Sequence, residues 1–476
     1  MFGVRRLASG VLTGALAGAA ACGGPAAPTA QVAPARGMPV IVDTDMASDD
    51  IMALAYLLDD PAVSVRAITV EGTGVAHGLP GARNALRLIR ALRIRQPIPV
   101  GYGPPSPLAG SRSFPLAWRA GADAMYGLGL AMDGLGLPAW RGPQPAETAI
   151  RLLVRTITRS PRPVRLITLG PLTDVALALR ADPGIADKIA GIYAMAGAVR
   201  VPGNEPVHGL AEWNVYIDPT AAARVLRSGI PMTFIPLDAS DNVPITPFFR
   251  NVVQAHPRTR ALRLVANMLR DPYYSQAPVY FWDPLAAVTA TDQRAVRLQP
   301  ERLVIGTAEG PGRGVTRVSP SGTTARVAVW ASAPAFQRQF LTVLNGGRPL
   351  PVPTVPAARR LAVSFDGSSY RYHGPRGAPA GPLQVRLADR SPVALDSFGL
   401  VIGKLLHGRT LADVQAVIRR GTATRVPAWF KVAATIPAAP YAQPAWGVTL
   451  GPGRYALVCQ RVRDGAWYAL TTVIIR

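Results

Sequence analysis

The sequence predicts an α/β protein, with a doubly wound, mainly parallel sheet followed by a small β-sandwich. Two observations carry this prediction. Between residues 38 and 345, short apolar runs alternate with segments whose apolar residues recur at helical spacing. Beyond a proline-rich stretch, the pattern changes to short β-rich runs separated by Gly and Pro turns.

Residues 1–22 have the pattern of an export signal: two arginines, an apolar stretch and small residues before Cys22. The apolar stretch is shorter than the roughly 20 residues that a membrane span needs. Ala19-Ala20-Ala21-Cys22 resembles a bacterial lipoprotein cleavage site, which would lipidate Cys22 and leave residues 23–37 as a tether. A plain secretory signal with an incidental cysteine is the alternative. The chain is therefore expected to be exported to a bacterial cell envelope and to meet the membrane through a lipid anchor only.

The first folded domain is predicted over residues 38–345. Its expected elements follow in chain order: strand Met38–Val42, helix Ile51–Leu58, strand Val65–Val70, helix Ala82–Leu92, helix Thr148–Ile157, strand Val164–Leu169, a helix from Leu172, strand Ile189–Met195, helix Thr220–Leu226 and strand Met232–Ile235. Ligands of such folds bind beyond the carboxyl ends of the strands, so candidate site residues are expected there.

Residues 346–356 are predicted to be a linker, because four prolines in eleven residues cannot continue a helix or a central strand. Residues 357–476 are expected to form the β-sandwich, with strands at Arg360–Phe365, Leu383–Ala388 and Tyr455–Val458. This segment faintly resembles a cupredoxin-like domain. A blue-copper site needs two His, a Cys and usually a Met, and neither His nor Met follows Cys459, so no copper is expected.

The composition limits the classes of partner. The formal net charge of +23 would suit anionic partners, or it reflects Arg used as general surface charge. No Lys/Arg-rich run interleaved with aromatic residues occurs, so no nucleic-acid partner is expected. The only cysteines are Cys22 and Cys459, and lipidation of the first would leave no intramolecular disulfide.

Four carboxylates lie within eight residues directly after the first predicted strand, at Asp43, Asp45, Asp49 and Asp50. Carboxylates this close repel one another unless a cation compensates, and calcium prefers six to eight oxygen ligands. Helix capping is the alternative explanation, since acids favour the first turn of a helix. Capping does not explain the two acids at the end of the strand, so the loop predicts a metal site.

The acidic loop resembles the signature of the inosine–uridine-type nucleoside hydrolases, Asp-x-Asp, three residues and then Asp-Asp. Three further segments match that family in the same order. They are Leu169-Gly170-Pro171-Leu172-Thr173-Asp174, the sugar-loop residues Gly203-Asn204 with Ala211-Glu212-Trp213-Asn214 and Asp218-Pro219, and finally Trp282-Asp283. The resemblance covers roughly residues 38–345 and implies a sheet of nucleoside hydrolase type.

The resemblance also implies roles for individual residues. Asp45, Asp50, Asp283 and the main-chain carbonyl of Leu169 would bind Ca²⁺, and Asp45 would act as general base. The residues implied to bind the sugar are Asp49, Asn204, Glu212 and Asn214. The implied activity is calcium-dependent hydrolysis of the N-glycosidic bond of ribonucleosides to ribose and free base, whose oxocarbenium-like transition state suits carboxylates.

The sequence departs from the family in two places. Trp282 stands where many members have His, so leaving-group assistance would come from a stacked indole. The family's Gly-Asn after the second strand is replaced by Gly72-Thr73-Gly74, with His77 nearby as either a pocket residue or a solvated loop residue. The aromatic residues Trp118, Tyr126 and Tyr280 are candidates for a base pocket or for ordinary packing.

Two alternatives remain beside the nucleoside hydrolase. The chain could be a non-catalytic envelope protein that binds nucleosides or sugars, or a hydrolase of another ribosylated compound. Intact Asp45, Asp49, Asp50 and Asp283 favour catalysis, because a binding protein has no need of a general base. The expected partner is a small-molecule nucleoside, and assembly into a homo-oligomer is compatible with the sequence.

Overall fold

A computed structural model describes residues 37–127, 140–271, 273–276, 279–350, 359–366, 368–389, 398–420, 426–436, 445–461 and 465–476. The predicted export signal, Cys22 and the predicted tether up to residue 36 lie outside these residues. So do residues 351–356 of the predicted linker.

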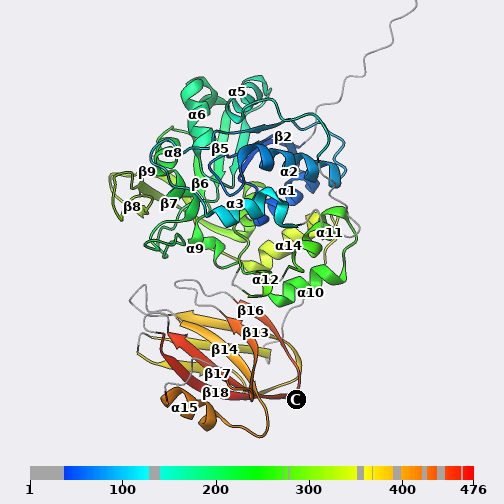
Figure 1. Ribbon diagram of the computed structural model, residues 1–476, viewed down its shortest axis with the longest axis vertical. Coiled ribbons are helices and arrows are strands. Elements are labelled where there is room, and N and C mark those ends of the chain that lie inside the picture. Colours follow the sequence, from blue (N-terminus) through cyan, green and yellow to red (C-terminus); the bar gives the residue numbers. More distant parts are fainter. Residues whose placement is uncertain are drawn as a thin grey trace, which may run out of the picture. The chain divides into compact units, whose positions relative to one another are not determined.

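The first part of the chain forms a nine-stranded sheet in the order β3-β2-β1-β4-β5-β6-β9-β7-β8 (Figure 1). Its strands are β1 (Met38–Thr44), β2 (Val63–Val70), β3 (Val100–Tyr102), β4 (Val164–Thr168), β5 (Ile189–Ala194), β6 (Met232–Phe234), β7 (Val296–Ile305), β8 (Thr316–Val318) and β9 (Thr323–Ala331). Strands β1 to β6 pair in parallel and β9 joins β6 in parallel, whereas β7 runs antiparallel to both β8 and β9. The predicted mainly parallel, doubly wound sheet is confirmed, and the antiparallel extension was not predicted.

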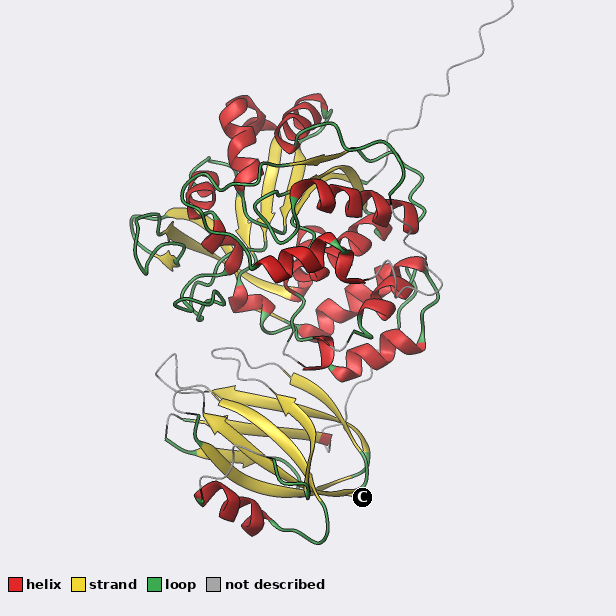
Figure 2. Ribbon diagram, viewed as in Figure 1, coloured by secondary structure: helices red, strands yellow, loops and turns green. Residues whose placement is uncertain are grey.

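Helices surround the central strands (Figure 2). They are α1 (Ser48–Asp59), α2 (Gly78–Ala91), α3 (Leu116–Asp123), α5 (Ala149–Arg159), α6 (Thr173–Ala181), α7 (Trp213–Ile217), α8 (Pro219–Leu226), α9 (Leu237–Ser240), α10 (Pro247–Ala255), α11 (Arg260–Met268), α12 (Tyr273–Gln276), α13 (Trp282–Thr291) and α14 (Ala333–Leu344), with 3₁₀ turns at Met125–Gly127, Pro183–Lys188 and Gln293–Ala295. The helices predicted from apolar spacing all occur, each within the span of α1, α2, α5, α6 or α8 or extending it by a residue or two.

Strand β1 is an inner strand of the sheet, between β2 and β4, and is buried on both faces. Val40 and Val42 belong to one apolar cluster, together with α1, α13 and α14, while Ile41 belongs to a second cluster with α5, α6 and α8. Successive side chains of a strand point to opposite faces, so a continuous apolar run is what a doubly covered strand requires. The polar residues of the loop that follows β1 therefore start at the edge of a rigid core.

The predicted β-sandwich is also confirmed, as two sheets in the orders β11-β10-β13-β16 and β12-β18-β17-β14-β15. Its elements are β10 (Arg360–Phe365), β11 (Tyr370–His373), β12 (Gly377–Ala378), β13 (Gly381–Asp389), β14 (Phe398–Leu405), α15 (Leu411–Arg419), β15 (Phe430–Ile436), β16 (Ala445–Leu450), β17 (Gly453–Arg461) and β18 (Trp467–Ile475). Inward-facing residues such as Val385, Leu400 and Leu457 form its core. Cys459 is fully buried in that core as a free thiol.

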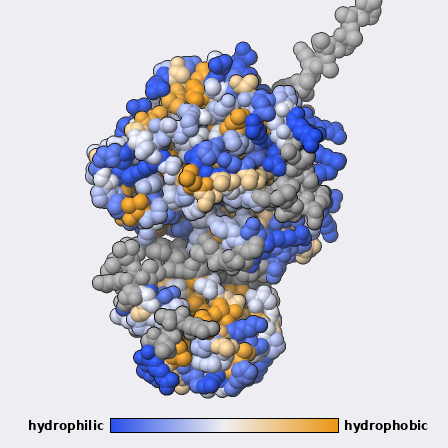
Figure 3. Space-filling view, in the orientation of Figure 1, coloured by the Kyte–Doolittle hydropathy of each residue, from blue (hydrophilic) through white to orange (hydrophobic). Residues whose placement is uncertain are grey.

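The surface carries polar and apolar side chains in small, interspersed groups on the face drawn in Figure 3. Leu116 and Trp118 of α3 are among the exposed large apolar residues. No helix within the described part of the chain is both long enough and apolar enough to cross a bilayer.

Candidate active site

The loop that follows β1 is organised around the Asp50 carboxylate. Asp50 Oδ1 accepts hydrogen bonds from the Thr44 hydroxyl and from the backbone N–H of Asp45, the latter at 3.1 Å, and Oδ2 accepts one from the backbone N–H of Ala47 at 3.0 Å. Met46 between them has a φ of 59°, a left-handed conformation that costs a non-glycine residue of order 1–3 kcal/mol. The surrounding hydrogen bonds hold this conformation, which turns the chain sharply between Asp45 and α1.

Asp45 is held from two sides by glycine backbones. A Cβ atom at Gly74 would lie 2.0 Å from Asp45 Cβ, and one at Gly170 would lie 2.7 Å from it. The Asp45 carboxylate accepts hydrogen bonds from the backbone N–H groups of Val75 at 3.1 Å and of Ala47 at 3.3 Å. The turns after β2 and β4 thus fix the position of this carboxylate, and only glycine leaves room for it.

Gly74→Ala is expected to displace Asp45 and to lower the free energy of unfolding by about 1–3 kcal/mol, the usual cost of overpacking. Denaturant unfolding measures the stability loss. Gly312→Ala is the matched control, because a Cβ there meets no atom within 4 Å and should leave stability unchanged. Equal stability of the two variants would show that the turn after β2 adapts freely.

Asp283 completes the acidic cluster from a distant part of the sequence. It lies in the first turn of α13, which packs beside α1, and carboxylate oxygens of Asp49, Asp50 and Asp283 lie within 4.8 Å of one another. Asp45 contacts this cluster through Asp50. The structure therefore brings the three predicted carboxylate ligands together with Asp49, although more than 200 residues of sequence separate Asp50 from Asp283.

Burial raises the pKa of every carboxyl group in this cluster. Desolvation, followed by repulsion from Asp45, raises the pKa of Asp49 to about 7, and desolvation raises the pKa of Asp50 to about 6. The same desolvation raises the pKa values of Asp45 and Asp283 well above the usual range, with neighbouring carboxylates adding to it. The described residues that line the site include no Lys, Arg or His, and Arg119, outside the lining, is the basic side chain whose charge interacts with Asp45. A bound cation would supply countercharge within the site.

The acidic cluster forms one end of a cavity of about 590 Å³. Apart from His77, all the residues predicted for catalysis, metal binding and substrate binding line this cavity: Asp45, Asp49, Asp50, Leu169, Asn204, Glu212, Asn214, Trp282 and Asp283. Asn214 Nδ2 donates to the carbonyls of Leu169 at 3.1 Å and Met195 at 3.0 Å. A single cavity thus holds both the predicted metal ligands and the predicted sugar-binding residues.

Glu212 fixes the start of α7. Its carboxylate accepts hydrogen bonds from the backbone N–H groups of Asn214 at 2.8 Å, Gly197 at 3.0 Å and Val215 at 3.2 Å. Desolvation still raises its pKa to about 7. Asn204 Oδ1 accepts the backbone N–H of Trp213 at 3.0 Å, so the two halves of the predicted sugar loop hold each other.

Aromatic side chains line another part of the cavity. The rings of Phe114 and Trp213 stack with centroids 5.0 Å apart, and Trp118 lies 5.3 Å from Trp213. Of the three aromatic candidates, Trp118 and Tyr126 line the cavity, whereas Tyr280 does not and belongs to the apolar cluster of the sandwich. Such a wall offers flat apolar faces on which a nucleobase can stack.

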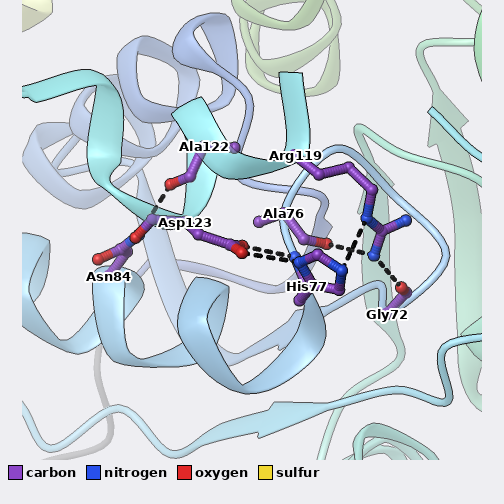
Figure 4. A network of polar contacts seen from close by, with 7 residues as sticks. All are labelled: Gly72, Ala76, His77, Asn84, Arg119, Ala122 and Asp123. Carbon is purple, nitrogen blue, oxygen red and sulfur yellow. Dashed lines mark hydrogen bonds and ion pairs between the residues drawn. The ribbon is translucent and has the colours of Figure 1, made fainter. Parts of the chain in front are cut away.

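The structure does not bring His77 together with the other predicted site residues. His77 does not line the cavity; its ring is 49% exposed, and Nδ1 lies 2.7 Å from Asp123 Oδ2 (Figure 4). Arg119 Nε donates to His77 Nε2 at 3.3 Å, and Arg119 Nη2 donates to the carbonyl of Gly72 at 2.9 Å. His77 therefore joins the start of α2 to α3, and this pairing uses both ring nitrogens.

Several cavity residues were not predicted. Tyr273 and Tyr274 of α12, Phe114 before α3 and Met195 after β5 all contribute. Met195 follows a parallel strand at the carboxyl edge of the sheet, a position that could have marked it. The tyrosines of α12 lie in a four-residue helix without periodicity, so no local signal distinguishes them.

Comparison with known proteins agrees with this geometry. The family model described as inosine-uridine preferring nucleoside hydrolase matches residues 40–338. Pyrimidine-specific ribonucleoside hydrolase RihA of Salmonella paratyphi B is 35% identical over 208 residues, which make up 44% of this chain and 63% of that relative. The match thus spans less than two thirds of the relative's length.

Two solved structures share the fold. An inosine-uridine preferring nucleoside hydrolase from Bacillus anthracis superposes with a TM-score of 0.57 at 24% identity, over 65% of this chain and 99% of that one. A purine-preferring ribonucleoside hydrolase from Gardnerella vaginalis gives a TM-score of 0.54 at 27% identity, over 65% of this chain and 98% of that one. Because the family model covers well over half of the sequence, this chain belongs to the inosine-uridine preferring nucleoside hydrolase family.

Proposed function

We propose that the protein hydrolyses the N-glycosidic bond of ribonucleosides to ribose and free base, and that it depends on Ca²⁺. The observation that carries the proposal is one cavity with Asp45, Asp49, Asp50 and Asp283 at one end and an aromatic wall elsewhere. This arrangement offers an anionic region for a developing oxocarbenium charge and flat faces for a base.

The donor set suits calcium. Carboxylates of Asp45, Asp50 and Asp283 together with the Leu169 carbonyl provide hard oxygen ligands, and no sulfur or imidazole is among them. Burial of several carboxylates side by side, with no basic residue among the described residues that line the cavity, favours the binding of positive charge there. When bound, Ca²⁺ would supply that charge, acidify a water molecule and hold the ribose hydroxyls.

The protein residues divide the remaining tasks. Asp45 takes the proton of the attacking water, and its two backbone hydrogen bonds fix the direction in which it does so. Asp49 and Asn214 hold ribose hydroxyls close to the acidic cluster, and Asn204 and Glu212 hold the far hydroxyl of the sugar. Each unpaired polar group would cost on the order of 1–3 kcal/mol, which disfavours deoxy analogues.

The activity is tested by incubating the purified full chain with inosine, uridine and their 2′-deoxy analogues and measuring free sugar. Ribose is expected from the ribonucleosides, with much less release from the deoxy compounds. Tight nucleoside binding without any release of ribose would instead support the non-catalytic envelope binding protein. Release of ribose only from other ribosylated compounds would support the alternative of a hydrolase for such compounds.

Trp282 is proposed to assist departure of the base. Its indole lines the cavity, its Nε1–H donates to Asp241 Oδ1 at 3.3 Å, and its ring lies 5.6 Å from that of Tyr280. Stacking on a purine would favour protonation of the base by about 0.5–2 kcal/mol. A pyrimidine-specific and a purine-preferring enzyme are both among the relatives named above, so the base preference of this chain depends on its own pocket.

Trp282→Ala is expected to lower kcat on inosine more than on uridine and to change KM less than kcat, because stacking on a protonated base strengthens in the transition state. Trp330→Ala is the control: Trp330 is a partly exposed tryptophan of β9 outside the cavity. Equal losses on both bases with a lower melting temperature, and full activity of Trp282→Phe, would leave Trp282 as a packing residue.

We also propose that the protein is exported and lipid-anchored through Cys22. The support is the sequence pattern before that cysteine, with its charged start, apolar stretch and small residues. Fatty-acid labelling of cells that produce the full chain should mark the protein, and Cys22→Ser should remove the label. Secretion of an unlabelled, processed wild-type chain would contradict the anchor.

Assembly into a homo-oligomer is a separate proposal, tested by light scattering.

A further inference from the structure

A second group of buried acids lies at the same edge of the sheet, outside the cavity. Asp43 is near the end of β1, Glu71 directly follows β2 and Asp174 begins α6 after β4. Because β1 pairs with both β2 and β4, and Asp43 lies opposite Thr69 and Thr168, the three acids converge. One carboxylate oxygen of each lies within 4.8 Å of the others, and none of the three residues lines the cavity.

These acids have fewer hydrogen bonds than their burial requires. Thr69 Oγ1 donates to Asp43 Oδ1 at 2.6 Å, and Glu71 accepts from the Asp174 backbone N–H at 2.7 Å and from Thr73 Oγ1 at 3.1 Å. The carboxyl groups of Asp43 and Glu71 also contact each other, whereas both carboxylate oxygens of Asp174 have no hydrogen-bond partner, and Asp174 is 0% exposed. Each such buried acceptor costs about 1–3 kcal/mol, and more when it is charged.

Packing keeps the Asp174 carboxylate inside the cluster. A Cβ atom at Gly103 would lie 2.0 Å from Asp174 Oδ1 and 2.4 Å from Oδ2, so the carboxylate rests directly on the backbone of that glycine. Asp174 therefore cannot turn away from Asp43 and Glu71 into solvent. Desolvation and repulsion from Asp43 both disfavour the ionised form of this carboxyl group.

The geometry points to a second site for a hard divalent cation, bound by Asp43, Glu71 and Asp174. Two oxygens on opposite sides of a calcium ion are about 4.8 Å apart for bonds of about 2.4 Å, so the three carboxylates, within 4.8 Å of one another, can reach one ion of this size. Thr73 Oγ1 and Thr173 Oγ1, 3.1 Å apart, offer neutral oxygens nearby. The unpaired oxygens of Asp174 are the atoms that such an ion would satisfy.

This site goes beyond the proposed function, because hydrolysis needs no ion there. A cation at this place would tie together the ends of β1, β2 and β4, from which the Asp45 loop and the Gly74 and Gly170 turns start. Its role would be structural. Sharing of protons among the three carboxyl groups is the competing explanation of the same geometry.

The test is the metal content of the purified full chain after equilibrium dialysis against Ca²⁺ or, separately, Mg²⁺. After dialysis against at least one of the two cations, wild type is expected to bind about two ions per chain. Asp174→Asn and Asp50→Asn should each bind about one, because each variant removes a ligand from one of the two sites. Asp187→Asn, an exposed acid outside both clusters, should keep the wild-type content. If the wild-type chain bound the second ion but released no ribose, the proposed function would be overturned and the second site would stand.

A thermal measurement separates a cation from shared protons. If the site binds an ion, the melting temperature of Asp174→Asn should be higher than that of wild type in chelator, because the variant removes an unpaired charge. In the presence of the cation that dialysis identifies, its melting temperature should be lower than that of wild type, because the variant loses a ligand. Glu71→Gln is the substitute if Asp174→Asn does not fold. Crystals of wild type grown in manganese would show anomalous density among the three carboxylates. One ion per chain, unchanged in Asp174→Asn and without that density, would overturn the second site.

Discussion

Asp45→Asn is expected to lower kcat about 10³-fold, within the range for loss of a positioned general base. The amide keeps the size of the side chain and one acceptor oxygen, but it neither accepts the proton of water nor carries the charge that a cation needs. Its NH₂ group would also face a backbone donor, Val75 or Ala47, where the carboxylate now accepts hydrogen bonds.

The matched control is Asp238→Asn. Asp238 is also a buried acid that accepts two backbone N–H groups, from Val199 at 2.8 Å and Arg200 at 2.9 Å, but it does not line the cavity. Its kcat should stay within about twofold of wild type if the effect at Asp45 is chemical. Steady-state release of ribose measures both variants. If Asp45→Asn retained a tenth of wild-type turnover, another group would have to be the base.

Removal of calcium is expected to abolish activity and to lower the melting temperature. A ligand present at 100 times its dissociation constant stabilises the native state by about 2.7 kcal/mol, and chelation withdraws that stabilisation. Addition of Ca²⁺ should restore both properties, and Asp50→Ala should respond to neither treatment. Full turnover in a sample shown by elemental analysis to be metal-free would exclude the calcium-dependent mechanism.

The metal-free protein should also have a characteristic pH dependence. Asp49 and Asp50 have folded-state pKa values of about 7 and about 6, above the ordinary value of 3.8, so their protonated forms favour the folded state. That contribution is fully present below about pH 4 and is lost as pH rises through the folded pKa values. The chelated protein should therefore melt lower at pH 8 than at pH 5. With Ca²⁺ bound, the carboxylates stay ionised, and this fall should disappear.

Much of the site could be predicted because its residues follow strands. The acidic loop comes directly after β1, so the chain pattern alone indicated that Asp45, Asp49 and Asp50 would lie at the carboxyl edge of the sheet. Asp283 and Trp282 have no such local signal, and only the ordered match to the family indicated them. Their place depends on the packing of α13 beside α1, which is a tertiary property.

Three residues show the limit of local reasoning. His77 lies close in sequence to the Gly74 turn, but Asp123 and Arg119, 42 residues or more away, hold its ring outside the cavity. Glu71 and Asp174 were overlooked even though both follow strands adjacent to β1. Residues that follow parallel strands lie at the carboxyl edge of the sheet, and this applies to Glu71 and Asp174 as it does to the acidic loop. Only the strand order shows that they lie beside Asp43.

The buried thiol of Cys459 makes the sandwich observable on its own. Burial raises its pKa to about 12, and the side chain is inaccessible in the folded state, so alkylating reagents can reach it only when β17 separates from its neighbours. The rate of its modification would thus report the opening free energy of the C-terminal sheets alone. In the Cys22→Ser chain it is the single thiol, so a mass increase by one adduct would time that opening without any engineered label.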